Sequence, residues 1–404
     1  MVTLADVEAA REAIQGKVHR TPLRHSTTFS RLTGGTVHLK LENLQRTGSF
    51  KIRGAMNKMH SLTPDEKRGG VIAASAGNHA QGVALAASTL QIGSKIVMPS
   101  DASYAKVEAT RGYGAEVVLE GDDYDAAYAA AKRIQEEEGR TFVHAFNDPY
   151  IMAGQGTIAL ELLEDLPDVD TVVVSVGGGG LISGIATALK AKRPGTRVIG
   201  VEAEGAAPAF HSRQAGELVT LERATTMADC IATRRIGPLA FDIIEKHVDD
   251  LVTVSENEIA RSILMLLERG KTVVEGAGAA GLAALLAGRV DVKGETVACI
   301  VSGGNIDITL MGDILRRGLL EEGRILRFTT VIPDRPGQLK GIIDLIAREK
   351  GSIVSVYHDR DLLSLPLDKT LLDVEIETRG PRHVQRLIDV LREAGYTLDV
   401  HVGG

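Results

Sequence analysis

Short apolar segments alternate with segments of helical periodicity from Gly70 to Phe328, and this alternation restricts the chain to a few folds. Strands that alternate with helices form a mostly parallel sheet with helices on both faces. Several of the expected strands are nearly continuous runs of valine and isoleucine, which is typical of strands buried on both faces. The predicted strands are Val71–Ala74, Lys95–Met98, Ala115–Glu120, Thr141–Ala145, Thr171–Val176, Arg197–Glu202, Asp250–Val254 and Thr296–Val301. The sequence therefore predicts an α/β fold for this part of the chain.

The C-terminal part of the chain follows a different pattern. Its predicted order of strands and helices is βαββαβ, which is typical of a ferredoxin-like fold. The six elements are Ile325–Ile332, Gly337–Lys350, Ser352–Asp359, Leu371–Thr378, Pro381–Ala394 and Leu398–Val402. The charged, glycine-containing segment Gly318–Arg324 is predicted to be a linker between the two parts.

Composition and charge exclude several classes of function. The net charge is −7, so no basic excess indicates a nucleic acid or an anionic membrane as partner. Residues 1–17 are expected to form an amphipathic helix and not a signal peptide. The longest apolar runs are well short of the length of about 20 residues that a membrane span requires. Cys230 and Cys299 are too few for a disulfide framework or a thiolate metal cluster. We therefore expect a cytoplasmic protein.

The strongest candidate binding segment is the run of four glycines at Gly177, Gly178, Gly179 and Gly180, followed by Leu181. It lies between the predicted strand Thr171–Val176 and a predicted helix over 181–190. Glycines let the backbone come close to a ligand, and the N-terminus of the helix favours an anion, so the segment suits a phosphate. The alternative is a flexible turn, but four consecutive glycines at a strand-to-helix junction favour the binding function.

A dinucleotide site is the main competing interpretation, because Glu202 ends the next strand at about the place of a Rossmann acid. The fingerprint requires glycine at its first, third and sixth positions. Ile182 occupies the sixth position counted from Gly177, Ser183 occupies it counted from Gly178, and Leu181 occupies the third position counted from Gly179. No Gly-Lys-Ser/Thr closes the run, so a Walker A motif is also excluded. The sequence instead indicates one phosphate on a compact cofactor.

Lys51 is the candidate nucleophile. It lies between Phe50 and Ile52, and burial in such an apolar stretch would lower its pKa and free its amine for reaction. Most lysines are solvated surface groups, and by itself Lys51 would be placed among them. Two other segments follow predicted strands: Ser75-Ala76-Gly77-Asn78-His79, whose N–H groups suit a carboxylate, and Ser302 with Gly303, Gly304 and Asn305. A simple capped turn is the alternative for both.

Taken together, these segments resemble the fold-type II pyridoxal-phosphate enzymes, and among them the threonine dehydratases (threonine ammonia-lyases). The segments that carry the resemblance are Ser49–Ala55, Ser75–His79, Gly177–Leu181, Ser302–Asn305, Asp148-Pro149, Gly154–Thr157 and Glu275–Ala279. The resemblance covers roughly residues 4–320. It implies a catalytic region over 1–320 with two open, mostly parallel α/β sheets, in which a small subdomain (42–146) is inserted. Pro333–Leu339 is similar to the strand-to-helix turn of ACT domains, so 325–404 is expected to be a regulatory ACT domain.

The resemblance also implies roles for individual residues. Pyridoxal 5'-phosphate would form a Schiff base with Lys51, would be flanked by Phe50, and would receive a hydrogen bond from Asn78 at its ring hydroxyl. Gly177, Gly178, Gly179, Gly180 and Leu181 would hold the phosphate, and Ser302 would face the pyridine nitrogen. Ser75, Ala76, Gly77, Asn78 and His79 would bind the substrate carboxylate. The expected reaction converts L-threonine into 2-oxobutyrate and ammonia, and L-serine into pyruvate.

The main enzymatic rival is a serine racemase of the same fold type. Racemisation requires an acid or base on the face opposite Lys51, and the similar racemases have a serine where this chain has Ala76. Ala76 cannot transfer a proton, so dehydration is favoured. Those racemases also have a divalent-cation site near the segment that matches Glu202 and Ala206, but Pro208 takes the place of their acidic ligand, so we predict no metal here. A catalytically dead amino-acid sensor and a nicotinamide-dependent dehydrogenase are two further hypotheses, which the intact Lys51 and the failed glycine spacing disfavour.

The C-terminal domain suggests regulation and assembly. ACT domains bind amino acids where two modules pair, which implies isoleucine or valine as an allosteric effector if the enzyme serves isoleucine biosynthesis. The alternative is a domain kept for dimerisation alone. Pairing of these modules, together with the habit of the family, implies a homo-oligomer, a tetramer or a dimer.

Overall fold

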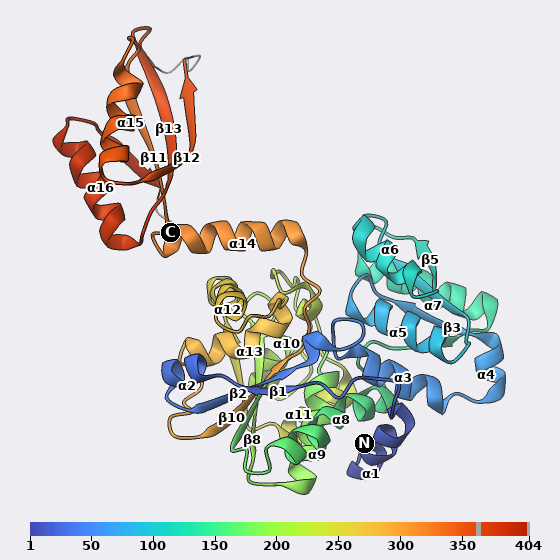
Figure 1. The fold of residues 1–404 in the computed structure, drawn as a ribbon. Coiled ribbons are helices and arrows are strands. Elements are labelled where there is room, and N and C mark those ends of the chain that lie inside the picture. Colours follow the sequence, from blue (N-terminus) through green and yellow to red (C-terminus); the bar gives the residue numbers. More distant parts are fainter. Residues whose placement is uncertain (361–364, 402–404) are drawn as a thin grey trace. The chain divides into compact units, whose positions relative to one another are not determined.

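The computed structural model describes residues 1–360 and 365–401 and divides the chain into two compact units, 1–307 and 308–404 (Figure 1). The division lies at the start of helix α14 (Ile308–Glu321), ahead of the join predicted at 320–325. The predicted linker Gly318–Arg324 is wrong in its first half, because α14 continues through Gly318 to Glu321. The prediction failed because a glycine and charged residues occur both in linkers and near the ends of exposed helices, so the sequence does not distinguish the two.

The centre of the first unit is a six-stranded sheet in the order β1-β2-β10-β7-β8-β9. Its strands are parallel except β1, which pairs with β2 in the antiparallel direction. The strands are β1 (Leu23–His25), β2 (Thr36–Leu41), β7 (Thr171–Ser175), β8 (Arg197–Ala203), β9 (Asp250–Val254) and β10 (Thr296–Val301). The four predicted strands of this sheet are confirmed. Strands β1 and β2 were not predicted, because β1 is short and half-exposed and β2 carries His38 and Lys40 among its apolar residues.

Helices cover both faces of this sheet, as Figure 1 shows. Val172 and Val174 of β7 belong to the core beneath α8, α9 and α11, whereas Val173 faces Gly281 of α13 on the other side. The helices and short 3-10 turns of this part are α1 (Leu4–Ile14), α2 (Thr27–Thr33), η1 (Glu42–Leu44), α8 (Pro149–Asp165), α9 (Gly180–Lys192), α10 (Pro208–Ala215), η2 (Asp229–Ile231), α11 (Pro238–His247), α12 (Glu256–Glu268) and α13 (Gly276–Leu286). The continuous valines of β7 are thus explained by burial on two faces.

A second parallel sheet, in the order β5-β4-β3-β6, lies within the same unit. Its strands are β3 (Val71–Ala74), β4 (Ser94–Met98), β5 (Glu116–Leu119) and β6 (Thr141–Phe142). The accompanying helices are α3 (Lys51–Ser61), α4 (Pro64–Gly69), α5 (Asn78–Thr89), α6 (Tyr104–Gly112) and α7 (Tyr124–Glu138). The prediction of two open, mostly parallel α/β sheets is confirmed, although β6 ends three residues before the predicted Ala145.

The second unit contains the predicted βαββαβ order, folded as an antiparallel sheet β12-β13-β11-β14. Its elements after α14 are β11 (Ile325–Pro333), α15 (Gln338–Arg348), β12 (Ser352–Asp359), β13 (Lys369–Glu377), α16 (Pro381–Glu393) and β14 (Leu398–His401). Phe328, Ile346 and Val374 are fully buried in a core between the sheet and these two helices. Val402, the predicted end of the last strand, lies outside the described residues.

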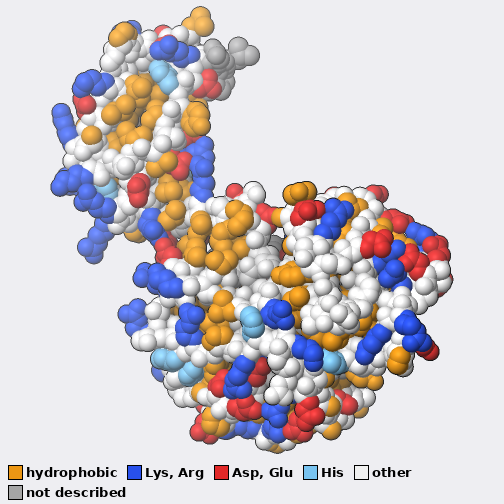
Figure 2. Space-filling view, turned by 45° about the vertical axis from the view of Figure 1, so that its right-hand side comes forward, with side chains coloured by type: hydrophobic (Ala, Val, Ile, Leu, Met, Phe, Trp, Pro, Cys, Tyr) orange, Lys and Arg blue, Asp and Glu red, His pale blue; other side chains and the backbone are white. Residues whose placement is uncertain are grey.

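In the part of the chain that the structure describes, no helix is long and apolar enough to cross a membrane. Figure 2 shows basic and acidic side chains interspersed over the face that it presents.

Candidate active site

The candidate site is a cavity at the carboxyl ends of strands of the large sheet, where open α/β sheets bind ligands. It receives residues from segments far apart in the sequence. The lining residues are Phe50, Lys51, Asn78, Phe146, Ser175, Gly177, Gly178, Gly179, Gly180, Leu181, Cys230, Ile231, Glu275, Ala277 and Ser302. All nine residues that were predicted to bind the cofactor lie in this lining. Their roles remain predictions.

Lys51 is the first residue of α3, and its amine lies in the cavity. The Nζ atom donates a hydrogen bond to the carbonyl oxygen of Ala145 at 3.1 Å and lies 5.2 Å from the centre of the Phe50 ring. Burial lowers the Lys51 pKa from 10.5 to about 8, and the neighbouring Cys230 and Glu275 offset part of that lowering. A substantial fraction of the Lys51 amine is therefore unprotonated in mildly alkaline solution.

The glycine run forms a turn between β7 and α9. Gly179 has φ of +89°, a left-handed conformation that side chains disfavour, and Gly180 begins the helix. A Cβ atom on Gly178 would lie 2.2 Å from the Phe146 ring, and one on Gly179 would lie 2.6 Å from the Cβ of Ala240. The turn therefore requires glycine at both positions, and the start of α9 presents backbone N–H groups and a partial positive charge to an anion.

Asn78 belongs to a chain of hydrogen bonds along the wall of the cavity. Its Nδ2 donates to Glu275 Oε1 at 2.7 Å, and its Oδ1 accepts from Asn305 Nδ2 at 2.7 Å. Asn305 Nδ2 also donates to the Thr47 carbonyl oxygen at 2.8 Å. These partners fix which way the Asn78 amide points, so its N–H group is directed toward acceptors on the Glu275 side.

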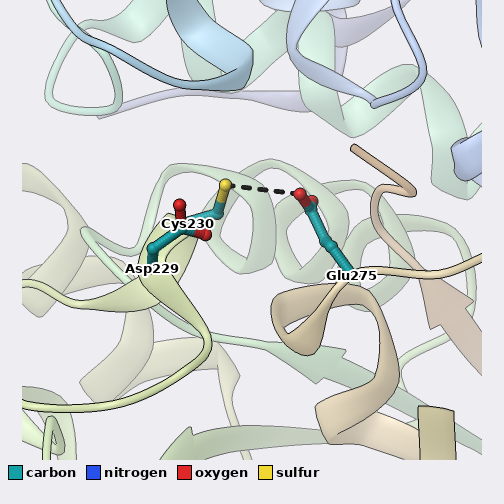
Figure 3. Close-up of side chains that lie close together, drawn as sticks. All are labelled: Asp229, Cys230 and Glu275. Atoms are coloured by element: carbon teal, nitrogen blue, oxygen red, sulfur yellow. Dashed lines mark hydrogen bonds between the residues drawn. The ribbon is translucent and has the colours of Figure 1, made fainter. Parts of the chain in front are cut away.

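Sequence reasoning did not place Glu275 or Cys230 in the site. The Cys230 thiol contacts Glu275 Oε2 at 3.4 Å, and Figure 3 shows the two side chains pointing toward each other, with Asp229 beside Cys230. Burial raises the Glu275 pKa to about 7 and raises the Cys230 pKa well above its ordinary value. The residue types carried no signal for this pairing. The only available signal was that Glu275 begins a segment typical of the family.

Ser302 follows β10 and is 2% exposed. Its Oγ accepts a hydrogen bond from Ser175 Oγ at 3.3 Å, so the Ser302 hydroxyl proton is free to point toward another acceptor. The Ser302 carbonyl oxygen accepts from the Phe50 N–H group at 3.1 Å. This bond ties the strand end to the segment that carries Lys51.

The predicted carboxylate-binding loop joins β3 to α5. Ser75, Ala76 and Gly77 are half-buried, and the Ser75 Oγ accepts from the Gly77 N–H group at 3.1 Å. Of the five predicted residues, Asn78 is the one that lines the cavity. His79 is turned away, with Nε2 3.0 Å from the Val143 carbonyl oxygen, and burial lowers its pKa to about 3.

Glu202, considered above as a cation ligand, has a partner within the protein. Its carboxylate accepts from the N–H groups of Ala209 at 3.0 Å and Phe210 at 2.7 Å, near the start of α10. Glu204 is exposed and lies 3.8 Å from Arg289. Both carboxylates therefore have structural partners.

The cavity fits a compact cofactor with one phosphate. The glycine turn packs closely against Phe146 and Ala240 and leads into the start of α9, whose backbone N–H groups suit a phosphate. The lining also contains the Lys51 amine, a nucleophile suited to an aldehyde. The Asn78 amide and the Ser302 hydroxyl are hydrogen-bonding groups suited to a ring hydroxyl and a ring nitrogen.

Comparison with known proteins identifies this class of site. Residues 14–303 match the family model of pyridoxal-phosphate dependent enzymes, and the chain belongs to that family. It is 48% identical over 400 residues to the L-threonine ammonia-lyase of Thermotoga maritima, covering 99% of this chain and all of that one. It is 49% identical over 395 residues to the L-threonine ammonia-lyase of Geobacter sulfurreducens, covering 98% of each. Maize serine racemase is a similar solved structure, with a TM-score of 0.75, 36% identity and coverage of 79% of this chain and 98% of that one.

Proposed function

We propose that this chain is a threonine ammonia-lyase, which dehydrates and deaminates L-threonine to 2-oxobutyrate and ammonia, and converts L-serine to pyruvate. The observation that carries the proposal is the buried Lys51 amine, placed in one cavity with the glycine turn of a pyridoxal-phosphate dependent enzyme. Identity of 48–49% over nearly the whole chain to two L-threonine ammonia-lyases supports threonine as the substrate.

The residues present suit particular parts of pyridoxal phosphate. The Gly177–Leu181 turn would hold the phosphate, Lys51 would bind the aldehyde carbon, and Asn78 would donate to the ring hydroxyl. When bound, the cofactor supplies an electron sink for the bond between Cα and its proton. The Ser302 hydroxyl facing the ring nitrogen would not keep that nitrogen protonated, as a carboxylate would. This weaker sink suits elimination better than chemistry with long-lived carbanions.

Lys51 is the proposed acid-base catalyst. Burial lowers its pKa to about 8, so in mildly alkaline solution a substantial fraction of the amine is free to act as a general base. The freed amine would take the proton from substrate Cα, after which the β-hydroxyl leaves. The enamine product then tautomerises and hydrolyses to the 2-oxo acid and ammonia.

The loop from Ser75 to His79 is the proposed carboxylate site. Asn78 begins α5, so the loop precedes a helix N-terminus, whose N–H groups and partial positive charge favour an anion. This placement would orient the substrate with its Cα near Lys51. It leaves the β-substituent free to depart.

A serine racemase is the second candidate, because maize serine racemase is among the similar structures. Ala76, on the predicted substrate loop, has no group that can carry a proton. The identity of 36% is also lower than that to the ammonia-lyases. Both observations favour elimination over racemisation.

The test is 2-oxo acid release from L-threonine, L-serine and D-serine by the purified protein with added pyridoxal phosphate. We expect 2-oxobutyrate from L-threonine faster than pyruvate from L-serine, and loss of both in Lys51→Ala. Interconversion of the serine enantiomers without release from threonine would establish the racemase. Near-normal product formation by Lys51→Ala would refute the role of Lys51.

The C-terminal unit is the proposed ACT regulatory domain, over 325–404, with isoleucine or valine as effector. Its ferredoxin-like order supports this proposal. Val331, Val354 and Tyr357 on its strands are 41%, 58% and 70% exposed, as expected if such modules pair in a homotetramer or homodimer. Kinetics of the full chain with and without each amino acid, and its mass by light scattering, test both points. The free thiols Cys230 and Cys299 support a cytoplasmic location.

A further inference from the structure

Three side chains with metal-binding atoms lie close together: Asp229, Cys230 and Glu275 (Figure 3). Cys230 and Glu275 line the cavity, and Asp229 is exposed beside it. Asp229 and Cys230 lie on the short turn η2, and Glu275 precedes α13. One ligand atom of each side chain lies within 4.8 Å of those of the other two. The cluster is separate from the Glu202 region considered above for a cation.

The spacing of the two inner atoms matches what one tetrahedral ion requires. Zinc binds sulfur at about 2.3 Å and carboxylate oxygen at about 2.0–2.2 Å, so a tetrahedral angle separates the two ligand atoms by about 3.5–3.7 Å. Cys230 Sγ and Glu275 Oε2 are 3.4 Å apart. Both residues can therefore bind one ion with little movement.

The Glu275 carboxylate is oriented by two neighbours. Glu275 is 3% exposed and lines the cavity, and its Oε1 accepts from Asn78 Nδ2 at 2.7 Å. Its Oε2 accepts a hydrogen bond from the Cys230 thiol, whose Sγ lies at 3.4 Å. An ion that replaced the thiol proton would lie between Oε2 and Sγ, and Asn78 would act as the outer partner that orients the ligating carboxylate.

The surrounding charges decide how easily an ion enters. The Lys106 amine lies 2.8 Å from the exposed Asp229 carboxylate, and this ion pair would have to break before Asp229 could bind an ion. The cost is small, because an exposed ion pair contributes little to stability. Lys51 lies across the same cavity and opposes a cation while protonated. The ion would displace the Cys230 thiol proton, which leaves to solvent. The resulting thiolate and the two carboxylates carry three negative charges, which exceed the charge of a divalent ion.

We propose that a thiophilic divalent cation, of the class of Zn²⁺ and Cd²⁺, binds to Asp229, Cys230 and Glu275 and closes the Lys51 cavity to substrate. The three protein ligands leave a fourth position open, as in zinc sites that keep a water. The binding site rests on the geometry alone. The inhibition rests also on the proposed lyase function.

The experiment titrates the full-length holoenzyme with Cd²⁺ and follows the ultraviolet charge-transfer absorbance of a cadmium–thiolate bond. We expect the band in the wild-type protein and in Cys299→Ala, because Cys299 is fully buried in β10, away from the cluster. We expect no band in Cys230→Ser. Asp229→Asn, a change at an exposed residue that should fold normally, should weaken Cd²⁺ affinity by about tenfold or more.

Binding is refuted if the wild-type protein shows no band, if the band survives Cys230→Ser, or if Asp229→Asn binds Cd²⁺ as tightly as the wild type. Turnover of L-threonine should fall in parallel with the band and return when a chelator removes the ion. A band without loss of turnover overturns the inhibitory role. A protein that forms the band but never had lyase activity overturns the proposed function and leaves the binding site intact, so the two failures are distinguishable.

Discussion

Replacing Lys51 by methionine should make the cofactor-free protein more stable, although the change removes the group on which catalysis depends. Methionine keeps the length and apolar stem of lysine and removes its charge. In the wild-type protein that charge lies in the cavity beneath the Phe50 ring, where burial lowers the Lys51 pKa to about 8. The stability gained by the variant is therefore a direct measure of how strongly the fold disfavours the protonated amine.

The magnitude follows from the change in pKa. Each pKa unit corresponds to about 1.36 kcal/mol, so a lysine whose pKa falls from 10.5 to about 8 destabilises the folded state by at most about 3.4 kcal/mol at neutral pH. Lys51 is half-buried and lines an open cavity, so water screens part of this cost. We expect a gain of about 1–2 kcal/mol in the free energy of unfolding. This corresponds to a rise in Tm of about 1–3 °C.

The pH dependence has a defined sign. Below pH 8 the amine is protonated in both the folded and the unfolded wild-type protein, and the full advantage of Lys51→Met is present. Between pH 8 and 10.5 the unfolded chain binds more protons than the folded one, so wild-type stability rises with pH. The difference between the two proteins should therefore shrink to near zero across this window.

Calorimetry of the cofactor-free proteins at pH 7 and pH 10 provides the assay, with Lys246→Met as the matched control. Lys246 is exposed on α11, and its replacement should change stability by no more than about 0.5 kcal/mol. A Lys51→Met variant that is less stable than the wild type at pH 7, or whose advantage is the same at pH 10, would refute the argument from burial.

Two further predictions concern the turn and the core around the site. Gly178→Ala should weaken pyridoxal phosphate binding by about tenfold or more, because the new Cβ would lie 2.2 Å from the Phe146 ring. The measurement is a titration that follows the absorbance of the cofactor. The control Gly195→Ala, where nothing lies within 4 Å of the new Cβ, should bind the cofactor normally. Glu42→Gln should lower the free energy of unfolding by about 3–5 kcal/mol in urea, because Arg53 is fully buried and donates two 2.8 Å hydrogen bonds to the Glu42 carboxylate. Unchanged cofactor affinity in the first case, or unchanged stability in the second, would contradict these contacts.

Local patterns in the sequence determined most of the architecture. Alternating strands and helices, continuous valines in Thr171–Ser175 and four glycines before α9 are properties of neighbouring residues, and neighbouring residues decide burial and turn geometry. The nine residues predicted to bind the cofactor could be named from the sequence because they lie at strand ends or helix starts, and because their motifs resemble those of a known family. Gly177–Leu181 and Ser302 follow β7 and β10 of the large sheet, whose carboxyl ends lie at one edge. Asn78 follows β3 of the second sheet, and Phe50 and Lys51 lie at the start of α3, so packing between these parts brings all nine into one cavity.

The tertiary structure alone decided which further residues line the site. Cys230 and Glu275 are 45 positions apart in the sequence, and their contact depends on how η2 and the start of α13 meet. Phe146 fills the space that absent Cβ atoms leave at Gly178, and the Ala145 carbonyl oxygen accepts from Lys51. Such contacts depend on packing between distant segments, and periodicity along the chain carries no information about them. The same limit explains why His79, adjacent to Asn78 in sequence, turns out of the cavity toward Val143.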